Sequence, residues 1–147
     1  MKRLRTLLFA SSENERSTDI GLLVLRVSTG FAMAIAHGWG KIPPSEGFIA
    51  KTGDLGFPLP EVFAWAAGLS EFAGGLLIAL GLLTRPAAAA LLFTMGVAFF
   101  GAHAGDPFGD REMAFLYGMI SLALMATGAG RYSLDALLGR QRPLAQR

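Results

Sequence analysis

Four uninterrupted apolar stretches, each long enough to cross a lipid bilayer as a helix, constrain this chain more than any other feature of its sequence. They cover residues 20–38, 59–83, 86–104 and 112–130. A helix needs about 20 apolar residues to span a hydrocarbon core of about 30 Å. The runs also lack the polar and apolar alternation of membrane β-barrel strands. The pattern therefore predicts an all-α fold, an integral membrane four-transmembrane-helix bundle.

The composition agrees with a chain that folds in lipid rather than in water. Hydrophobic residues make up 52% of the chain and charged residues only 16%, and the mean hydropathy is +0.46. Roughly a quarter of the residues in a soluble domain are charged. The sequence contains no cysteine, which excludes disulfides and any cysteine-ligated cofactor. Redox chemistry would therefore need a cofactor that is not held by thiolates.

Basic residues are distributed unequally between the two sides of the predicted bundle. Most of the thirteen Lys and Arg lie in the two termini and in the turn at 84–86, whereas Lys41, Lys51 and Arg111 lie on the other side. The positive-inside rule then predicts that both the N and C termini are cytoplasmic. The same distribution accounts for the net charge of +2 as a topology signal, so we expect no nucleic acid partner.

The connections between the apolar stretches indicate a single domain. We expect a cytoplasmic N-terminal tail over 1–19, a transmembrane domain over 20–130 and a basic cytoplasmic C-terminal tail over 131–147. The segment 38–58 is rich in proline and glycine and is predicted to be a structured loop, long enough to form a lid or a re-entrant segment. The short turn at 84–86 predicts that the second and third helices are antiparallel neighbours.

Small residues recur along the predicted second helix. Gly68, Gly74, Gly75 and Gly81 all fall within it. Glycine allows transmembrane helices to approach each other closely, so these positions predict close helix packing rather than a ligand site.

Two charged residues, Arg26 and Glu71, are predicted to lie inside the membrane. Arg26 falls about 9 Å into the first helix at a rise of about 1.5 Å per residue, and Glu71 falls near the middle of the second helix. A carboxylate at that depth is costly unless it is protonated, paired or facing a water-filled cavity. We therefore predict an ion pair between Arg26 and Glu71, either as a structural clamp or as a catalytic pair.

The two histidines, His37 and His103, are predicted to lie at the same, non-cytoplasmic end of the bundle. Imidazoles at one depth on different helices can ligate a metal, hold a haem or donate hydrogen bonds to a quinone carbonyl, and they can equally face lipid headgroups. The eleven-residue spacing of Arg26 and His37 places both on one stripe of a regular helix. No metal-ligand spacing is present, so no metal site is predicted.

Further polar and aromatic residues are predicted at the same end. Glu61 opens the second apolar stretch, Glu112 opens the fourth, and Lys41 follows the first. Trp39 and Trp65 lie at a similar level, where an aromatic belt at the membrane interface is the alternative to a ligand pocket. The predicted ligand-binding residues are therefore His37, Lys41, Glu61, His103, Glu112, Trp39 and Trp65, and the predicted catalytic residues are Glu71 and Arg26.

Three motifs in order resemble the DoxX family of small four-helix bacterial membrane proteins. They are LLVLRVSTGFAMAIAHGWGKI at 22–42, LSEFAGGLLIALGLLTRPAAAALL at 69–92 and GAGRYSLDALL at 128–138. The family's first-helix arginine matches Arg26, its HGxxK ending matches His37 and Lys41, and its mid-membrane glutamate matches Glu71. The resemblance implies a multi-pass protein of the bacterial inner membrane.

The resemblance also implies a redox role, because similar family members include a subunit of thiosulfate:quinone oxidoreductase and a component of a mycobacterial membrane oxidoreductase complex. We therefore expect a membrane subunit of a quinone-linked oxidoreductase or of an oxidative-stress complex. Its polar intramembrane cavity would open to the non-cytoplasmic side, and quinone is the expected cofactor. The expected partners are the lipid bilayer and peripheral redox enzymes, with a homo-oligomer left open.

Two other functions fit the same residues. A noncatalytic membrane anchor could recruit peripheral redox enzymes through the basic C-terminal tail. A small-solute transporter could use the mid-membrane carboxylate of Glu71. Residue patterns alone do not decide between these functions and the oxidoreductase.

Overall fold

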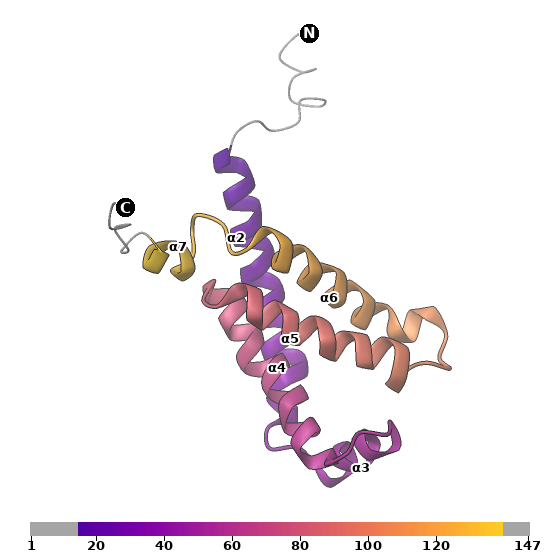
Figure 1. Ribbon diagram of the computed structural model, residues 1–147. Coiled ribbons are helices and arrows are strands. Elements are labelled where there is room, and N and C mark those ends of the chain that lie inside the picture. The colour runs from indigo at the N-terminus through magenta and orange to yellow at the C-terminus, as the bar shows by residue number, and fades with distance from the viewer. Residues whose placement is uncertain (1–14, 140–147) are drawn as a thin grey trace, which may run out of the picture.

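The computed structural model describes residues 15–139, and every regular element in this part of the chain is a helix (Figure 1). Four long helices make up most of it: α2 (Glu15–Ala32), α4 (Pro60–Leu80), α5 (Thr84–Val97) and α6 (Phe108–Thr127). The predicted all-α class is confirmed. The predicted tail residues 1–14 and 140–147 lie outside the described residues.

Three continuous spans are long and apolar enough to cross a membrane: Arg16–Lys41, Pro60–Leu80 and Thr84–Ala102. They fall on the first three predicted stretches. The first is longer than α2 because the π-helical segment η1 (Met33–Gly38) and the single turn η2 (Trp39–Lys41) continue it. A second π-helical segment, η3 (Ala98–Ala102), likewise extends α5. The stretch predicted as the fourth span corresponds to α6, which packs against α5.

The helices form two antiparallel pairs that share a core. α4 packs against both α2 and α5, and α5 packs against α6, as Figure 1 shows. The turn between α4 and α5 makes these two helices antiparallel neighbours, as predicted. Buried apolar side chains from all four helices meet in the core, including Met33, Ile78, Leu91 and Leu124.

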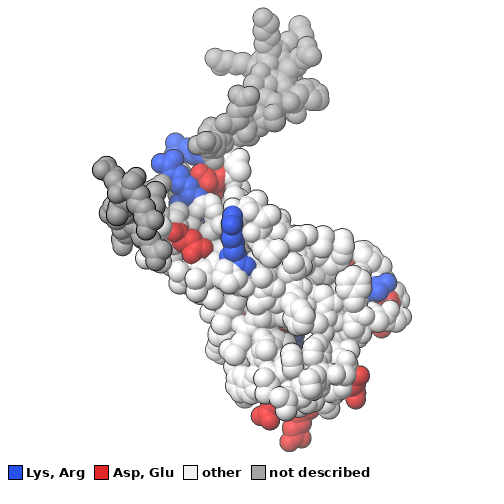
Figure 2. Space-filling view, viewed as in Figure 1, with Lys and Arg blue, Asp and Glu red and all other residues white. Residues whose placement is uncertain are grey.

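The outer surface of the bundle is apolar, and charged groups are buried inside it. Ile35, Phe93 and Phe100 are more than half exposed, whereas the side chains of Arg26 and Glu71 are buried. Figure 2 shows a broad uncharged surface with charged residues gathered toward its extremities. A water-soluble protein rarely exposes so large an apolar surface, so this surface is suited to contact with lipid tails.

Direct backbone contact between α2 and α4 brings these helices unusually close. A Cβ atom added at Gly30 would lie 2.5 Å from the carbonyl oxygen of Gly75, and one added at Gly75 would lie 2.8 Å from that of Gly30. Both distances are too short for real Cβ atoms, so any larger residue would push the helices apart. The prediction of close packing by the glycines of the second helix is confirmed for Gly75 and Gly68, whereas a Cβ at Gly74 would meet only ordinary contacts. Gly81 instead ends α4 in a left-handed conformation.

The connection between the first two spans contains a helix that the sequence analysis did not predict. Within the expected loop 38–58, α3 (Glu46–Asp54) begins after Ser45, whose hydroxyl accepts a hydrogen bond from the backbone N–H of Phe48. Serine is a favoured residue at this capping position. The surrounding prolines and glycines concealed this start signal. Leu55, just after α3, lies close to Gly101 of η3, so α3 and the α5–α6 connection share one end of the bundle, hereafter the α3 end.

The segment predicted as a C-terminal tail is folded as far as Gly139. It contains α7 (Leu134–Gly139), which lies beside the α4–α5 turn at the opposite end of the bundle, hereafter the α7 end (Figure 1). The backbone N–H of Asp135 donates to Gly81 O at 2.8 Å, and that of Arg131 donates to Asp19 Oδ1 at 2.9 Å. These contacts tie the segment to α2 and α4.

The α2–α4 contact predicts a clear difference between two glycine-to-alanine variants. Gly75→Ala should destabilise the protein by about 1–3 kcal/mol because the new methyl group overpacks the helix contact. Gly96→Ala is the matched control, since a Cβ at Gly96 meets nothing within 4 Å. Thermal unfolding of both variants in one detergent measures the effect. Equal melting temperatures for the two variants would contradict the direct helix contact.

Candidate functional site

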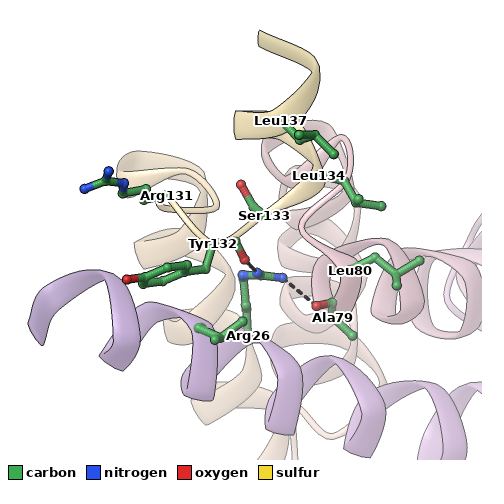
Figure 3. A pocket seen from close by; sticks show the side chains of 9 residues that line it. Arg26, Ala79, Leu80, Arg131, Tyr132, Ser133, Leu134 and Leu137 are labelled. Atoms are coloured by element: carbon green, nitrogen blue, oxygen red, sulfur yellow. Dashed lines mark hydrogen bonds between the residues drawn. The ribbon is translucent and has the colours of Figure 1, made fainter. Parts of the chain in front are cut away.

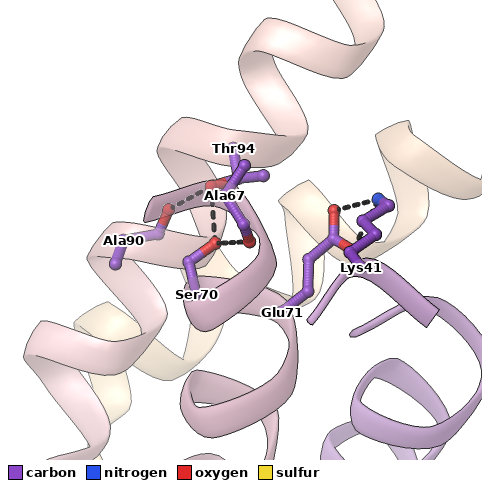
Figure 4. A network of polar contacts seen from close by, with 6 residues as sticks. All are labelled: Lys41, Ala67, Ser70, Glu71, Ala90 and Thr94. Carbon is purple, nitrogen blue, oxygen red and sulfur yellow. Dashed lines mark hydrogen bonds and ion pairs between the residues drawn. The ribbon is translucent and has the colours of Figure 1, made fainter. Parts of the chain in front are cut away.

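A buried carboxylate paired with a lysine forms the centre of the candidate site. Lys41 Nζ lies 2.7 Å from Oε1 and 2.6 Å from Oε2 of Glu71, so the ammonium group contacts both oxygens (Figure 4). The Glu71 side chain is 3% exposed and the Lys41 side chain 33%. The pair lies halfway along α4, in the interior of a helix bundle, and the charge of each group offsets the cost of burying the other.

Glycines on both sides of the contact bring Lys41 within reach of Glu71. A Cβ at Gly38 would clash with the backbone of Phe72, and one at Gly68 would lie 2.8 Å from Lys41 O. The chain from Gly38 to Lys41 therefore lies directly on α4, with no side chains between the two backbones. From that position the lysine side chain extends along α4 to the carboxylate.

The predicted ion pair between Arg26 and Glu71 is wrong. The Arg26 guanidinium instead donates to Ala79 O at 2.5 Å and to Tyr132 O. The register of the antiparallel helices explains the difference. Gly30 lies opposite Gly75, so Arg26, four residues earlier, lies opposite Ala79, four residues later. Glu71 is about 12 Å further along α4 at the rise of a regular helix.

The His37 ring contacts Tyr117 of α6 and does not lie beside Arg26. The two rings meet edge to face, with centroids 5.5 Å apart and planes at 74°. His37 is also close enough to Glu71 to interact with it electrostatically. The predicted common stripe of Arg26 and His37 assumed a regular α-helix, but His37 lies in η1, where i→i+5 hydrogen bonds wind the chain less per residue. The two side chains consequently contact different helices.

The other predicted site residues lie apart from this centre. Trp39 contacts the ring of Phe72, with centroids 5.5 Å apart, and is mostly exposed. His103 Nδ1 lies 2.7 Å from Asp106 Oδ2 in an exposed pair. Three residues are exposed and make no hydrogen bond, ion pair or ring contact with residues 15–139: Glu61, Glu112 and Trp65. Within that same part of the chain, no group of three His, Asp or Glu side chains is placed to hold a metal ion.

Three further polar residues were not predicted. Ser70 Oγ and Thr94 Oγ1 lie 2.6 Å apart and join α4 to α5 on the side of α4 away from Lys41 (Figure 4). Tyr117 is buried beside His37. A single hydroxyl-bearing residue in an apolar helix carries no sequence signal of its neighbours, so only the packing of the helices identifies these contacts.

Asp135 fixes the start of α5 at the α7 end. Its carboxylate accepts hydrogen bonds from the backbone N–H groups of Leu83 at 2.8 Å and Thr84 at 3.0 Å. Leu83 has a φ of 50°, a left-handed conformation that is unfavourable for leucine. Burial alone would raise the pKa of Asp135, but the hydrogen bonds from Thr84 and Leu83 and the positive charge of Arg26 outweigh it and lower that pKa.

These features define a helical membrane protein with an ion pair buried between its first two spans, and comparison with known proteins identifies its family. The DoxX family model matches residues 21–104, which include Arg26, His37, Lys41 and Glu71. The chain belongs to the DoxX family and is a multi-pass protein of the bacterial inner membrane. The closing motif at 128–138 lies beyond the matched residues.

Individual relatives match most of the chain. Inner membrane protein YqjF of Escherichia coli is 38% identical over 84% of this chain and 95% of its own length. Putative oxidoreductase CatD of Bacillus subtilis is 34% identical over 82% of this chain and 88% of its own. Inner membrane protein YphA of E. coli is 33% identical over 78% of this chain and 87% of its own length. No solved structure matches the chain.

A double-mutant cycle on Lys41 and Glu71 tests the buried ion pair. Lys41→Met should destabilise the protein by about 3–5 kcal/mol, since it leaves the buried Glu71 carboxylate without its partner. Glu71→Gln should cost less, because the Lys41 side chain that it leaves is 33% exposed. The double variant should be more stable than the sum of the single losses predicts. Thermal unfolding in detergent measures all four proteins. Additive losses would mean that the two side chains do not interact.

The lowered pKa of Asp135 predicts a pH-dependent contribution to stability. A carboxylate with a lowered pKa stabilises the folded state above its unfolded pKa of about 4, and this stabilisation is lost as pH falls through the folded pKa. At pH 7, the melting temperature of Asp135→Asn should therefore be lower than that of the wild type. The difference between the two melting temperatures should become smaller as the pH is lowered toward 3. A difference that stays constant between pH 7 and pH 3 would contradict this role.

Proposed function

We propose that this chain is the membrane subunit of a quinone-linked oxidoreductase, with its quinone site at Lys41, Glu71, His37 and Tyr117. One observation carries the proposal: the Lys41–Glu71 ion pair and the contacting rings of His37 and Tyr117 lie inside the helix bundle, with His37 within electrostatic range of Glu71. Ionisable groups at such depth are expensive, and they commonly mark proton relays or ligand pathways. The name of the relative CatD, a putative oxidoreductase, supports the same class of reaction.

The hydrogen-bonding groups of this cluster suit a quinone headgroup. The quinone carbonyl oxygens accept hydrogen bonds, and the His37 ring and the Tyr117 hydroxyl can each donate one. Neither side chain makes a hydrogen bond with any other residue between 15 and 139. The adjoining rings of Trp39 and Phe72 add an aromatic surface beside Glu71.

The protein's part in the reaction would be to bind the quinone and deliver protons. A bound quinone accepts two electrons and two protons to become a quinol. Glu71, held by Lys41, and His37 beside it provide a route for those protons. The electrons would come from a peripheral reductase docked at the membrane, because the chain has no cysteine to hold an iron–sulfur cluster.

We further propose that α6 is a fourth span and that the α7 end faces the cytoplasm. Arg85 and Arg131 lie at this end, whereas Lys51 and Arg111 lie toward the α3 end. The positive-inside rule then favours cytoplasmic N and C termini. In this orientation the cluster around Glu71 lies between the membrane interior and the non-cytoplasmic side.

Quenching of tryptophan fluorescence by decyl-ubiquinone tests the proposed site, since Trp39 contacts Phe72 next to Glu71. We expect saturable quenching by the purified protein in detergent. His37→Ala and Tyr117→Phe should each raise the Kd about tenfold, which corresponds to the loss of one hydrogen bond of about 1.4 kcal/mol. Ser28→Ala removes a hydroxyl on the exposed face of α2 and serves as the control.

Two results would contradict the proposal. One is quenching that does not saturate, and the other is an equal Kd in the wild type and in both site variants. Specific capture of a soluble redox enzyme without any quinone binding would instead support the noncatalytic anchor. Solute uptake into liposomes that Glu71→Gln abolishes would support the transporter.

A further inference from the structure

A cavity of about 490 Å³ opens at the α7 end, far from the cluster around Glu71 (Figure 3). Its walls come from α2, the end of α4 and the segment that follows α6. Most of its lining is apolar, and four leucines supply much of it: Leu23, Leu80, Leu134 and Leu137. Three of these, Leu80, Leu134 and Leu137, are exposed at the surface of the bundle, so the cavity is open to the surroundings.

Arg26 provides a buried positive charge that lines this cavity. Its side chain is 2% exposed, and its Nε atom is buried without a hydrogen-bond partner among residues 15–139. The groups that it does contact, Ala79 O and Tyr132 O, are neutral backbone carbonyls. Asp135 is near enough to interact electrostatically with Arg26, but no carboxylate between residues 15 and 139 forms an ion pair with it. Both oxygens of Asp135 instead accept hydrogen bonds from the start of α5. A buried arginine with a free donor is favourable when an anion completes its surroundings.

The cavity has a positively charged part and an apolar wall, which match the headgroup and the hydrocarbon chain of an amphiphilic molecule. Figure 3 shows Leu80, Leu134 and Leu137 on one side of the Arg26 guanidinium and Arg131 on the other. Arg131 also lines the cavity and is exposed. A headgroup anion placed between the two arginines would leave an attached acyl chain free to lie along the leucines. Such a molecule enters from the bilayer, where the cavity opens at the end of the spans.

We propose that this cavity binds an anionic phospholipid. Arg131 would donate hydrogen bonds to the phosphate, Arg26 would attract it by its positive charge from the cavity wall, and one acyl chain would pack against three leucines: Leu80, Leu134 and Leu137. The lipid would thereby join α2, the end of α4 and the segment that contains α7, adding to the hydrogen bonds that Arg26, Asp19 and Asp135 make between these parts. This proposal stands independently of the quinone site.

Native mass spectrometry of the full chain in detergent tests the proposal with phosphatidylglycerol, phosphatidylcholine and inorganic phosphate as probes. We expect one phosphatidylglycerol to bind at least about tenfold more tightly than phosphatidylcholine, a difference of about 1.4 kcal/mol. Both lipids offer a phosphate, but the choline cation of phosphatidylcholine would be repelled by the two arginines. Arg131→Gln and Leu137→Trp should each remove this preference, the first by deleting a headgroup contact and the second by filling the cavity. Lys51→Gln, an exposed cation at the α3 end, should leave it intact.

Arg26 itself is unsuitable as the first variant, because its hydrogen bonds also hold α4 and Tyr132 in place. Arg131 and Leu137 are exposed, so their variants should fold, which a wild-type-like melting temperature in lipid-free detergent would verify. Equal affinities for the two lipids would overturn the proposal, as would an unchanged preference in both folded variants. Inorganic phosphate binding as tightly as the lipid would overturn the acyl-chain contact and leave a simple anion site.

Discussion

The close contact of α2 with α4 determines which groups the buried charges of Arg26 and Glu71 meet. Gly30 and Gly75 allow the two backbones to touch, and Gly38 and Gly68 repeat this contact nearer the α3 end. Apolar side chains give little net attraction between helices in lipid, because lipid tails are equally apolar. Close backbone packing and buried polar contacts therefore have to hold the helices together. Once the register is set, Arg26 faces the end of α4 and Lys41 reaches Glu71.

This register separates two buried cations that serve different ends of the molecule. Lys41 neutralises Glu71 in the interior, next to His37 and Tyr117. Arg26 closes the α7 end, where it binds carbonyl groups of α4 and of the segment before α7. Asp135 completes that end by capping α5. The proposed quinone site thus lies about halfway along the α2–α4 pair, and the proposed lipid site lies at its α7 end.

The sequence was sufficient to predict the helical class, the first three spans and the packing role of Gly68 and Gly75, because hydropathy and residue size act locally. It also identified Arg26, Glu71, His37 and Lys41 as unusual residues in a membrane setting. It did not predict which of them pair, because that depends on helix register and on the π-helical turn at His37, neither of which leaves a periodic signal. α3 and α7 were missed because short helices among glycines and prolines lack an apolar run.

Solid-state NMR on the protein in lipid bilayers would test the α2–α4 register most directly. With nitrogen-15 in lysine and arginine side chains and carbon-13 in glutamate carboxyl groups, the account predicts a strong dipolar coupling between Lys41 Nζ and Glu71 Cδ. That coupling should disappear in Glu71→Gln. An arginine-to-glutamate coupling that disappears in Glu71→Gln while the lysine signal stays unchanged would place Arg26 beside Glu71 and contradict the register described above.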